Sequence, residues 1–256
     1  MLTGNNGGAI VVTCDGVSKA FELLENASGW RLAFGIRHCG ERFQALEDIS
    51  FDVPRGEFVG ILGRNGVGKS TLLRVIGGIY HPDRGRVRVR GDLSGLYEIG
   101  TTGQAELTGH EYARRFLRIG GVRGAELGRL IDEVQEFSEL DARFDDCIVT
   151  YSSGMVARLY FAVATARQHE VYLIDEILSV GDSHFQAKCW RRMRQRLGQG
   201  ASGVLVTHDW SAILKLCRTA HIIDGGCIVF SGPAERVVRR YLYPEKRRGR
   251  AAEPHR

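Results

Sequence analysis

The sequence predicts an α/β fold, in which short apolar strands alternate with helical segments along a chain of 256 residues. Two observations support this prediction. A glycine-rich loop at residues 63–71 connects a strand-like run to a helical one, and apolar runs recur later with helical stretches after them. From about residue 100 to 168 the pattern is mostly helical instead. We therefore expect a sheet with an inserted helical lobe.

The bulk properties fit a globular protein that stays in the cytosol. Hydrophobic residues make up 43% of the chain and charged residues 25%, which allows a real core. No apolar run approaches the roughly 18 residues that cross a bilayer, and the N-terminus lacks the pattern of a signal peptide. The six cysteines form no CxxC pair, which argues against a disulfide framework or a structural zinc site.

The net charge of +5 is modest, and much of it lies in the tail, residues 243–256. We expect this tail to be a disordered, solvated end. Contact with anionic lipid head groups is the alternative, since basic residues near a membrane surface each contribute up to roughly 1 kcal/mol.

The first third of the chain contains strands around one irregular segment. Ala9–Cys14 and Ile49–Val53 have strand patterns, and Glu57–Leu62 is a short buried strand. Between the first two lies the segment 22–43, which mixes aromatic and basic residues without a period of 2 or 3.6. We expect this segment to be an insert.

The glycine-rich loop fits the spacing of a phosphate-binding loop: Gly, four residues, Gly, Lys, Ser/Thr. Its residues are Gly63, Arg64, Asn65, Gly66, Val67, Gly68, Lys69, Ser70 and Thr71. The glycines let backbone N–H groups close around the α- and β-phosphates, Lys69 reaches the β- and γ-phosphates, and Ser70 ligates Mg²⁺. The helix expected over Ser70–Ile76 points its N-terminus at the phosphates. A chance glycine-rich turn is the alternative.

The remaining elements follow in order. His81–Gly85 forms a turn and Arg86–Arg90 a strand, after which one apolar helical face runs from Leu127 to Phe137. A second helix begins near Ser152. Strands return in three apolar runs, with helical stretches after the first two: Val171–Ile174, Gly203–Val206 and His221–Ile223.

Two carboxylates end the strand at 171–174. Asp175 is positioned to bind Mg²⁺, most simply through water, and Glu176 is the candidate general base for a water that attacks the γ-phosphate. Acidic residues at the start of a helix are the alternative explanation for such a pair. Together with the phosphate loop, the pair predicts a nucleoside triphosphatase.

Three further motifs indicate which kind. Tyr151–Met155 (YSSGM) precedes a helix, Leu178–Asp182 (LSVGD) follows the carboxylate pair, and His208 follows a strand. In this order they resemble the signature, the D-loop and the switch histidine of ABC-type ATPases. The resemblance implies a P-loop sheet of the ABC type with an inserted helical lobe and an N-terminal antiparallel β part, in a nucleotide-binding domain over residues 1–242.

In that family the signature faces the γ-phosphate held by a second copy. The resemblance therefore implies a head-to-tail homodimer with two shared ATP sites. Nucleotide contacts are implied for Ser152, Ser153, Gly154 and Asp182, and a catalytic role beside Lys69 and Glu176 for His208.

The match is closer to the ATPase subunits of bacterial exporters of O-antigen, capsular polysaccharide and teichoic acid. YSSGM, and VGD followed by Phe185 and Lys188-Cys189, are the discriminating features. The resemblance implies an integral-membrane permease partner, a lipid-linked polysaccharide cargo, no nucleic acid, and a peripheral location on the cytoplasmic face of the bacterial plasma membrane. It does not identify the sugar, and we expect no separate carbohydrate-binding domain after the last strand.

Three positions are less well determined. The glutamine that many ABC ATPases place before the helical lobe aligns with Glu98, a carboxylate that can still serve the Mg²⁺ shell, while Gln104 is the rival. Tyr112 stands where family members often have asparagine. Phe21 in VSKAF matches the aromatic residue that stacks on adenine, with a plain core role as the alternative.

The segment 22–43 is similar to an insert of the polysaccharide branch and is expected either to contact the permease or substrate or to close over its own domain as a surface loop. Two other functions remain possible at this point: a soluble ABC-type ATPase that acts on ribosomes or DNA, and an ABC transporter subunit with another cargo.

Overall fold

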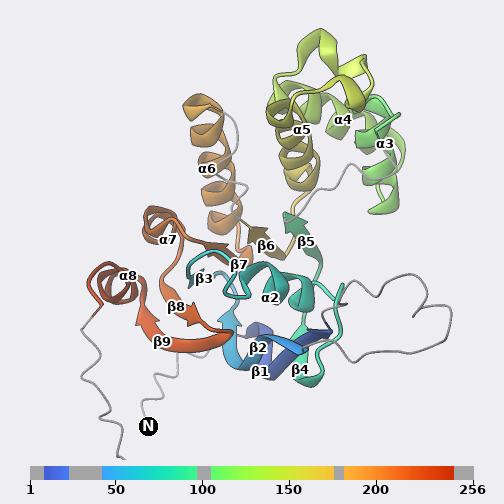
Figure 1. Ribbon diagram of the computed structural model, residues 1–256. Coiled ribbons are helices and arrows are strands. Elements are labelled where there is room, and N and C mark those ends of the chain that lie inside the picture. The colour runs from blue at the N-terminus through green and yellow to red at the C-terminus, as the bar shows by residue number, and fades with distance from the viewer. Residues whose placement is uncertain (1–8, 23–41, 97–104, 176–181, 245–256) are drawn as a thin grey trace, which may run out of the picture.

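The computed structural model describes residues 9–22, 42–96, 105–175 and 182–244. Two sheets and a group of helices make up the molecule (Figure 1). The α/β fold predicted from the sequence is confirmed, with an N-terminal antiparallel sheet and helices inserted between two strands of the central sheet.

The central sheet has six strands in the order β5-β6-β7-β3-β8-β9. All neighbouring strands are parallel except β8 and β9, which form an antiparallel pair. The strands are β3 (Phe58–Leu62), β5 (Leu93–Leu96), β6 (Val171–Asp175), β7 (Ser202–Thr207), β8 (Thr219–Asp224) and β9 (Cys227–Pro233). Because β3, β6 and β7 are buried along nearly their whole length, they are apolar without alternation.

The small antiparallel sheet has the order β2-β1-β4, with β1 over Ile10–Glu22, β2 over Arg42–Pro54 and β4 over Arg84–Val89. Both β1 and β2 are longer than predicted. Glu22 pairs with Arg42 and Phe21 with Phe43, so the two ends of the expected insert 22–43 belong to this hairpin. The rest of the insert lies outside the described residues.

Helix α2 (Lys69–Ile76) lies between the two sheets (Figure 1). Its buried side chains share one core with the small sheet and with one face of the central sheet. The other face of the central sheet carries the remaining helices in a second core. Every second residue of β3 points to each side: Val59 and Ile61 to the first core, Phe58 and Leu62 to the second.

The helices of the lobe are α3 (Gly109–Ile119), α4 (Gly124–Ser138) and α5 (Ser153–Ala166), followed on the sheet by α6 (Ser183–Gly198), α7 (Trp210–Leu216) and α8 (Ala234–Leu242). Thr108 begins α3 with a reciprocal capping box to Glu111. Short 3₁₀ turns at Asp141–Asp145 and Ile148–Thr150 connect α4 to α5. Among the described residues, none of the helices combines the length and hydropathy that a membrane-crossing segment needs.

Candidate functional site

Three predicted motifs meet at one edge of the central sheet. The glycine-rich loop follows β3, Asp175 ends β6, and His208 follows β7. These strands are parallel neighbours, with Leu62 paired to Thr207 and Asp175 to Val206. Since the carboxyl ends of adjacent parallel strands lie together, the fold brings the three motifs to the place where α/β proteins commonly bind ligands.

The glycine-rich loop is closely packed at both ends. A Cβ on Gly63 would lie 2.7 Å from the carbonyl oxygen of Ile223, and one on Gly68 would lie 2.4 Å from that of Ala45. Gly68 also has φ of +104°, a conformation that side-chain-bearing residues rarely adopt. Gly66, with φ of +81°, has no atom within 4 Å of such a Cβ and lies on the open side. The loop is therefore held in place by close packing at Gly63 and Gly68 and is open at Gly66.

Lys69 is the first residue of α2 and is buried, with only 6% of its surface exposed. Its Nζ donates hydrogen bonds to the carbonyl oxygens of Gly63 and Arg64, each at 2.9 Å. The ammonium thus lies back over the loop. No side chain caps α2 at Gly68, and its first turn has no acidic residue. The N–H groups of the first turn are therefore available to an anion.

The other loop residues lie around this opening. Arg64 and Asn65 are exposed, while Ser70 and Thr71 are half-buried in the first turn of α2. Val67 packs against the core between the sheets. None of these placements conflicts with the nucleotide contacts predicted for them.

Ser70 and Asp175, the predicted Mg²⁺ ligands, place a hydroxyl and a carboxylate at the same end of the sheet, and both are half-buried. Among the described residues there is no group of three or more His, Cys, Asp or Glu side chains that could hold a metal. A site with one hydroxyl and one carboxylate fits Mg²⁺, which keeps several waters and takes further oxygens from phosphates. Glu176, Glu98 and Gln104 lie outside the described residues.

His208 is exposed at the end of β7. The turn that holds it is well determined. The backbone N–H of Asp209 donates to Thr207 Oγ1 at 2.9 Å, and Asp209 caps α7 by accepting from the Ser211 N–H at 2.8 Å. This double cap fixes the backbone beside His208, which follows β7 at the same end of the sheet as the glycine-rich loop.

Phe21 lies within β1 rather than just after the first strand, because β1 continues beyond Cys14. Its half-buried ring meets Tyr80 edge-on at 5.3 Å between centroids, and Lys19 Nζ lies 5.5 Å from the ring. An ion pair of 2.9 Å from Lys19 to Asp83 ties this end of β1 to the chain after α2. Tyr80, which sequence reasoning missed, therefore adds a second aromatic ring; its only signal was its position after the glycine pair that ends α2.

The predicted signature lies at the start of α5. Ser152 caps this helix by accepting from the Met155 N–H at 3.2 Å. Ser152 and Ser153 are exposed, and a Cβ on Gly154 would meet only Ser152 Oγ, at 3.8 Å. None of the described residues thus requires glycine at position 154.

The far end of α5 is the part that contacts the sheet. Ser94 Oγ in β5 donates to the carbonyl oxygen of Ala164 at 3.0 Å. Ser153 lies eleven residues earlier, about 16 Å along the helix. Figure 1 shows α5 running from the lobe toward β5 and β6. The structure therefore does not bring the signature to the phosphate loop of the same chain.

Asp182 begins α6 and accepts a hydrogen bond from the Phe185 N–H at 2.9 Å. The carboxylate also forms an ion pair with Arg158 of α5. The hydrogen bond from Phe185 holds the pKa of Asp182 below its usual range, with the charge of Arg158 acting in the same direction. Asp182 is therefore anionic and tied to the signature helix.

Comparison with known proteins decides the family. The ABC transporter family matches residues 46–179, which include the glycine-rich loop, the signature region and the carboxylate pair. The chain belongs to the ABC transporter family. The ATP-binding subunit of an ABC transporter, a solved structure, has the same fold, with a TM-score of 0.73 at 23% identity over 91% of this chain and 93% of that one.

Two curated relatives of this ABC ATPase are more similar in sequence. The O-antigen export system ATP-binding protein RfbB of Klebsiella pneumoniae is 37% identical over 223 residues, or 87% of this chain and 85% of that protein. The teichoic acids export ATP-binding protein TagH of Listeria monocytogenes serotype 4b is 33% identical over 237 residues, or 92% of this chain and 70% of that protein.

Proposed function

We propose that this ABC ATPase powers the export of a lipid-linked polysaccharide, such as O-antigen, capsule or teichoic acid, across the plasma membrane. The names of RfbB and TagH support this cargo class. The observation that carries the ATPase mechanism is the convergence of the phosphate loop, Asp175 and His208 at one sheet edge.

In the proposed mechanism, the loop 63–71 and the N-terminus of α2 bind the phosphates of ATP, with Phe21 stacking on adenine. Lys69 leaves its two carbonyl acceptors to reach the β- and γ-phosphates. Ser70 and Asp175 hold Mg²⁺, which neutralises charge on the phosphates when bound. Glu176 accepts a proton from the attacking water, and His208 contacts the γ-phosphate. Fixed charges and N–H groups supply most of the rate acceleration.

We infer that a second copy completes each site. The start of α5 is an anion-binding device whose first turn has no acidic residue, and Ser152 and Ser153 are exposed there. In a head-to-tail dimer, Ser153 and Gly154 of one copy meet the γ-phosphate held by the other. Closing the dimer moves the helical lobe, and the lobe transmits this movement to a membrane permease.

The first test replaces the proposed base by Glu176→Gln. This variant keeps the size of the side chain and removes its basicity, so it should bind Mg-ATP, form a stable dimer and hydrolyse ATP at least about 100-fold more slowly, the scale on which general bases act. Steady-state phosphate release and size-exclusion chromatography measure the two effects.

Lys69→Ala is the matched control, because it weakens phosphate binding itself and should give neither hydrolysis nor an ATP-dependent dimer. Hydrolysis by Glu176→Gln at the rate of the unmodified chain contradicts the assignment of the base.

The second test distinguishes transport from the rival function of a soluble ATPase on ribosomes or DNA. Affinity capture of the full chain from detergent-solubilised membranes should recover a permease with several membrane spans, and cells lacking the chain should retain the lipid-linked polysaccharide inside. Recovery of ribosomal proteins in place of a permease contradicts the transport function. Capture of a permease without any change in polysaccharide export indicates another cargo.

A further inference from the structure

Glu139 has an unusual backbone conformation at the end of α4. It is the C-cap residue, with φ of 54° and ψ of 36°, in the left-handed region. Helices often end in this conformation, but glycine or asparagine usually occupies it, because a side chain makes it unfavourable. A glutamate at this position therefore calls for an explanation from its side chain.

The carboxylate of Glu139 joins three helices. Oε1 accepts a hydrogen bond from Lys188 of α6 at 2.8 Å, and Oε2 accepts one from Arg158 of α5 at 3.1 Å. His184 Nδ1 of α6 lies 3.9 Å from Oε1. Arg158 uses its other terminal nitrogen to bind Asp182, so Glu139 and Asp182 hold the same guanidinium.

These contacts are better shielded than an ordinary surface ion pair. The side chains of Glu139, Arg158 and Lys188 are only 31%, 20% and 25% exposed. Arg158 lies over the Phe185 ring at 4.9 Å, and Lys188 lies over the Phe137 ring at 4.7 Å. The hydrogen bond from Lys188 lowers the pKa of Glu139. The carboxylate is therefore ionised, and its cations are held in place by aromatic rings.

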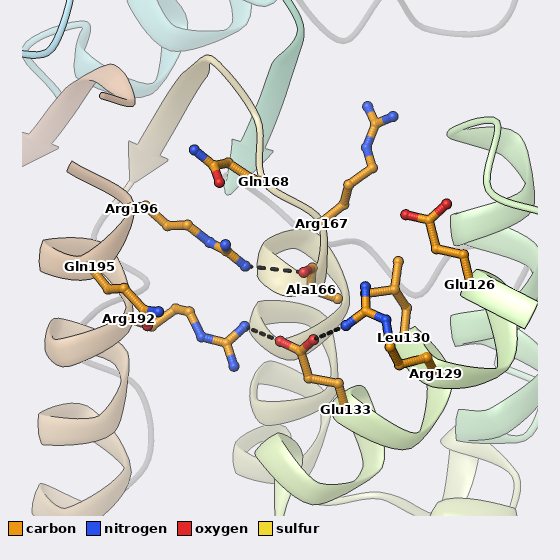
Figure 2. A pocket seen from close by; sticks show the side chains of 10 residues that line it. All are labelled: Glu126, Arg129, Leu130, Glu133, Ala166, Arg167, Gln168, Arg192, Gln195 and Arg196. Carbon is orange, nitrogen blue, oxygen red and sulfur yellow. Dashed lines mark hydrogen bonds and ion pairs between the residues drawn. The ribbon is translucent and has the colours of Figure 1, made fainter. Parts of the chain in front are cut away.

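A second contact joins α4 to α6 further from Glu139 (Figure 2). Arg192 Nη1 donates to Glu133 at 2.8 Å and to the carbonyl oxygen of Thr165 at 3.1 Å, while Arg196 donates to the same carbonyl at 2.6 Å. These arginines satisfy the C-terminus of α5 beside a pocket of about 490 Å³. The three helices are thus joined at two levels of α5, at Arg158 in its first half and at its C-terminus.

We propose that Glu139 is a positioning residue that joins the signature helix α5 and the D-loop helix α6 to the end of α4, so that Ser153, Gly154 and Asp182 reach the partner's nucleotide as one unit. This inference rests on the proposed function. Phe185 and Lys188, which distinguish the polysaccharide branch in the sequence, supply the ring and the cation of this joint.

The test is Glu139→Gly in the full chain with Mg-ATP. Glycine suits φ of 54° and removes only the side chain. We expect kcat to fall about tenfold, the scale of coupling between contacting groups. The KM for ATP should change less than about twofold, since the phosphate loop is untouched. Asp141→Gly is the matched control: Asp141 is exposed with φ of 46° and forms no ion pair with a described residue, so its kcat should stay unchanged.

A double-mutant cycle with Glu139→Gln and Lys188→Gln covers the case in which Glu139→Gly folds poorly. Non-additive losses of kcat support the joint, while additive losses overturn it. A normal kcat in Glu139→Gly also overturns the proposal, and so does an equal loss of kcat in Asp141→Gly. It is likewise overturned if a thermal melt shows that the fraction of unfolded Glu139→Gly accounts for the whole loss of kcat. If the unmodified chain itself shows no ATPase activity, the proposed function fails; if it hydrolyses ATP and Glu139→Gly does so equally, only the role of Glu139 fails.

Discussion

Two helix N-termini of this ABC ATPase are predicted to bind the phosphates of ATP, but their surroundings in the structure differ. The N-terminus of α2 is enclosed by its own chain: a Cβ on Gly63 or Gly68 would collide with the backbone of Ile223 or Ala45, and Lys69 is already buried over the loop. The N-terminus of α5 has none of these neighbours. Ser152 and Ser153 are exposed, and among the described residues a Cβ on Gly154 would meet only the side chain of Ser152.

The difference teaches how glycine can be required for two reasons. At Gly68, the fold itself excludes a side chain. At Gly154, the described residues leave room for one, so the packing seen here does not itself require glycine. This contrast is the strongest structural argument that the first half of the ATP site is built within one chain and the second half is completed between two.

The largest effect is expected at the enclosed terminus. In Gly68→Ala, the new methyl group would lie 2.4 Å from a carbonyl oxygen of β2, and alanine would have to adopt φ of +104°. Strain and overpacking each cost about 1–3 kcal/mol, so we expect unfolding free energy to fall by about 3 kcal/mol or more. Urea denaturation followed by circular dichroism measures this loss.

Gly66→Ala separates the two causes, because Gly66 has a positive φ but no atom within 4 Å of the added Cβ. It should lose only the strain component, about 1 kcal/mol. Equal losses in the two variants contradict the claim that Gly68 is held by close packing.

The sequence predicted the elements that carry the nucleotide motifs, because those motifs mark strand ends and helix starts directly. The loop after β3, Asp175 after β6 and Ser152 at the cap of α5 needed only local pattern. The prediction ended β1 too early. Gly16, with φ of +61° at a register shift between Cys14 and Val17, is a bulge within a continuing strand, although locally such a glycine looks like the end of one.

Other misses have different physical reasons. The prediction omitted β9, although Gly225 and Gly226 form a two-residue hairpin turn with positive φ, a signal that was present in the sequence. Strand β5 and helix α8 are too short for a clear period. The joint at Glu139 could not be predicted, because its partners Arg158 and Lys188 lie 19 and 49 residues away in the chain and only the packed helices bring them together.

A smaller but more specific effect is expected at the open terminus. In Gly154→Asp, an acidic residue enters the first turn of α5, where its interaction with the helix dipole stabilises the folded state by about 0.3–1 kcal/mol. Since the side chain has room, unfolding free energy should stay equal or rise slightly. Hydrolysis should nevertheless fall about 100-fold, because the carboxylate repels the γ-phosphate of the partner and the N–H groups lose their anion. Chemical denaturation and steady-state ATPase assays measure the two changes in the same preparation.

Gly128→Asp, on α4 of the same lobe, is the matched control: a Cβ there also has no neighbour within 4 Å, but the position lies beyond the first turn of α4, where the effect of the helix dipole has fallen off. It should keep its ATPase activity and gain no stability from the helix dipole. An active Gly154→Asp chain would mean that the start of α5 faces solvent throughout the cycle, and the enclosed terminus at α2 would then have to form the complete site. Since the start of α5 does not reach the phosphate loop of its own chain, stability that is kept while hydrolysis falls in Gly154→Asp but not in Gly128→Asp supports a site shared between two copies.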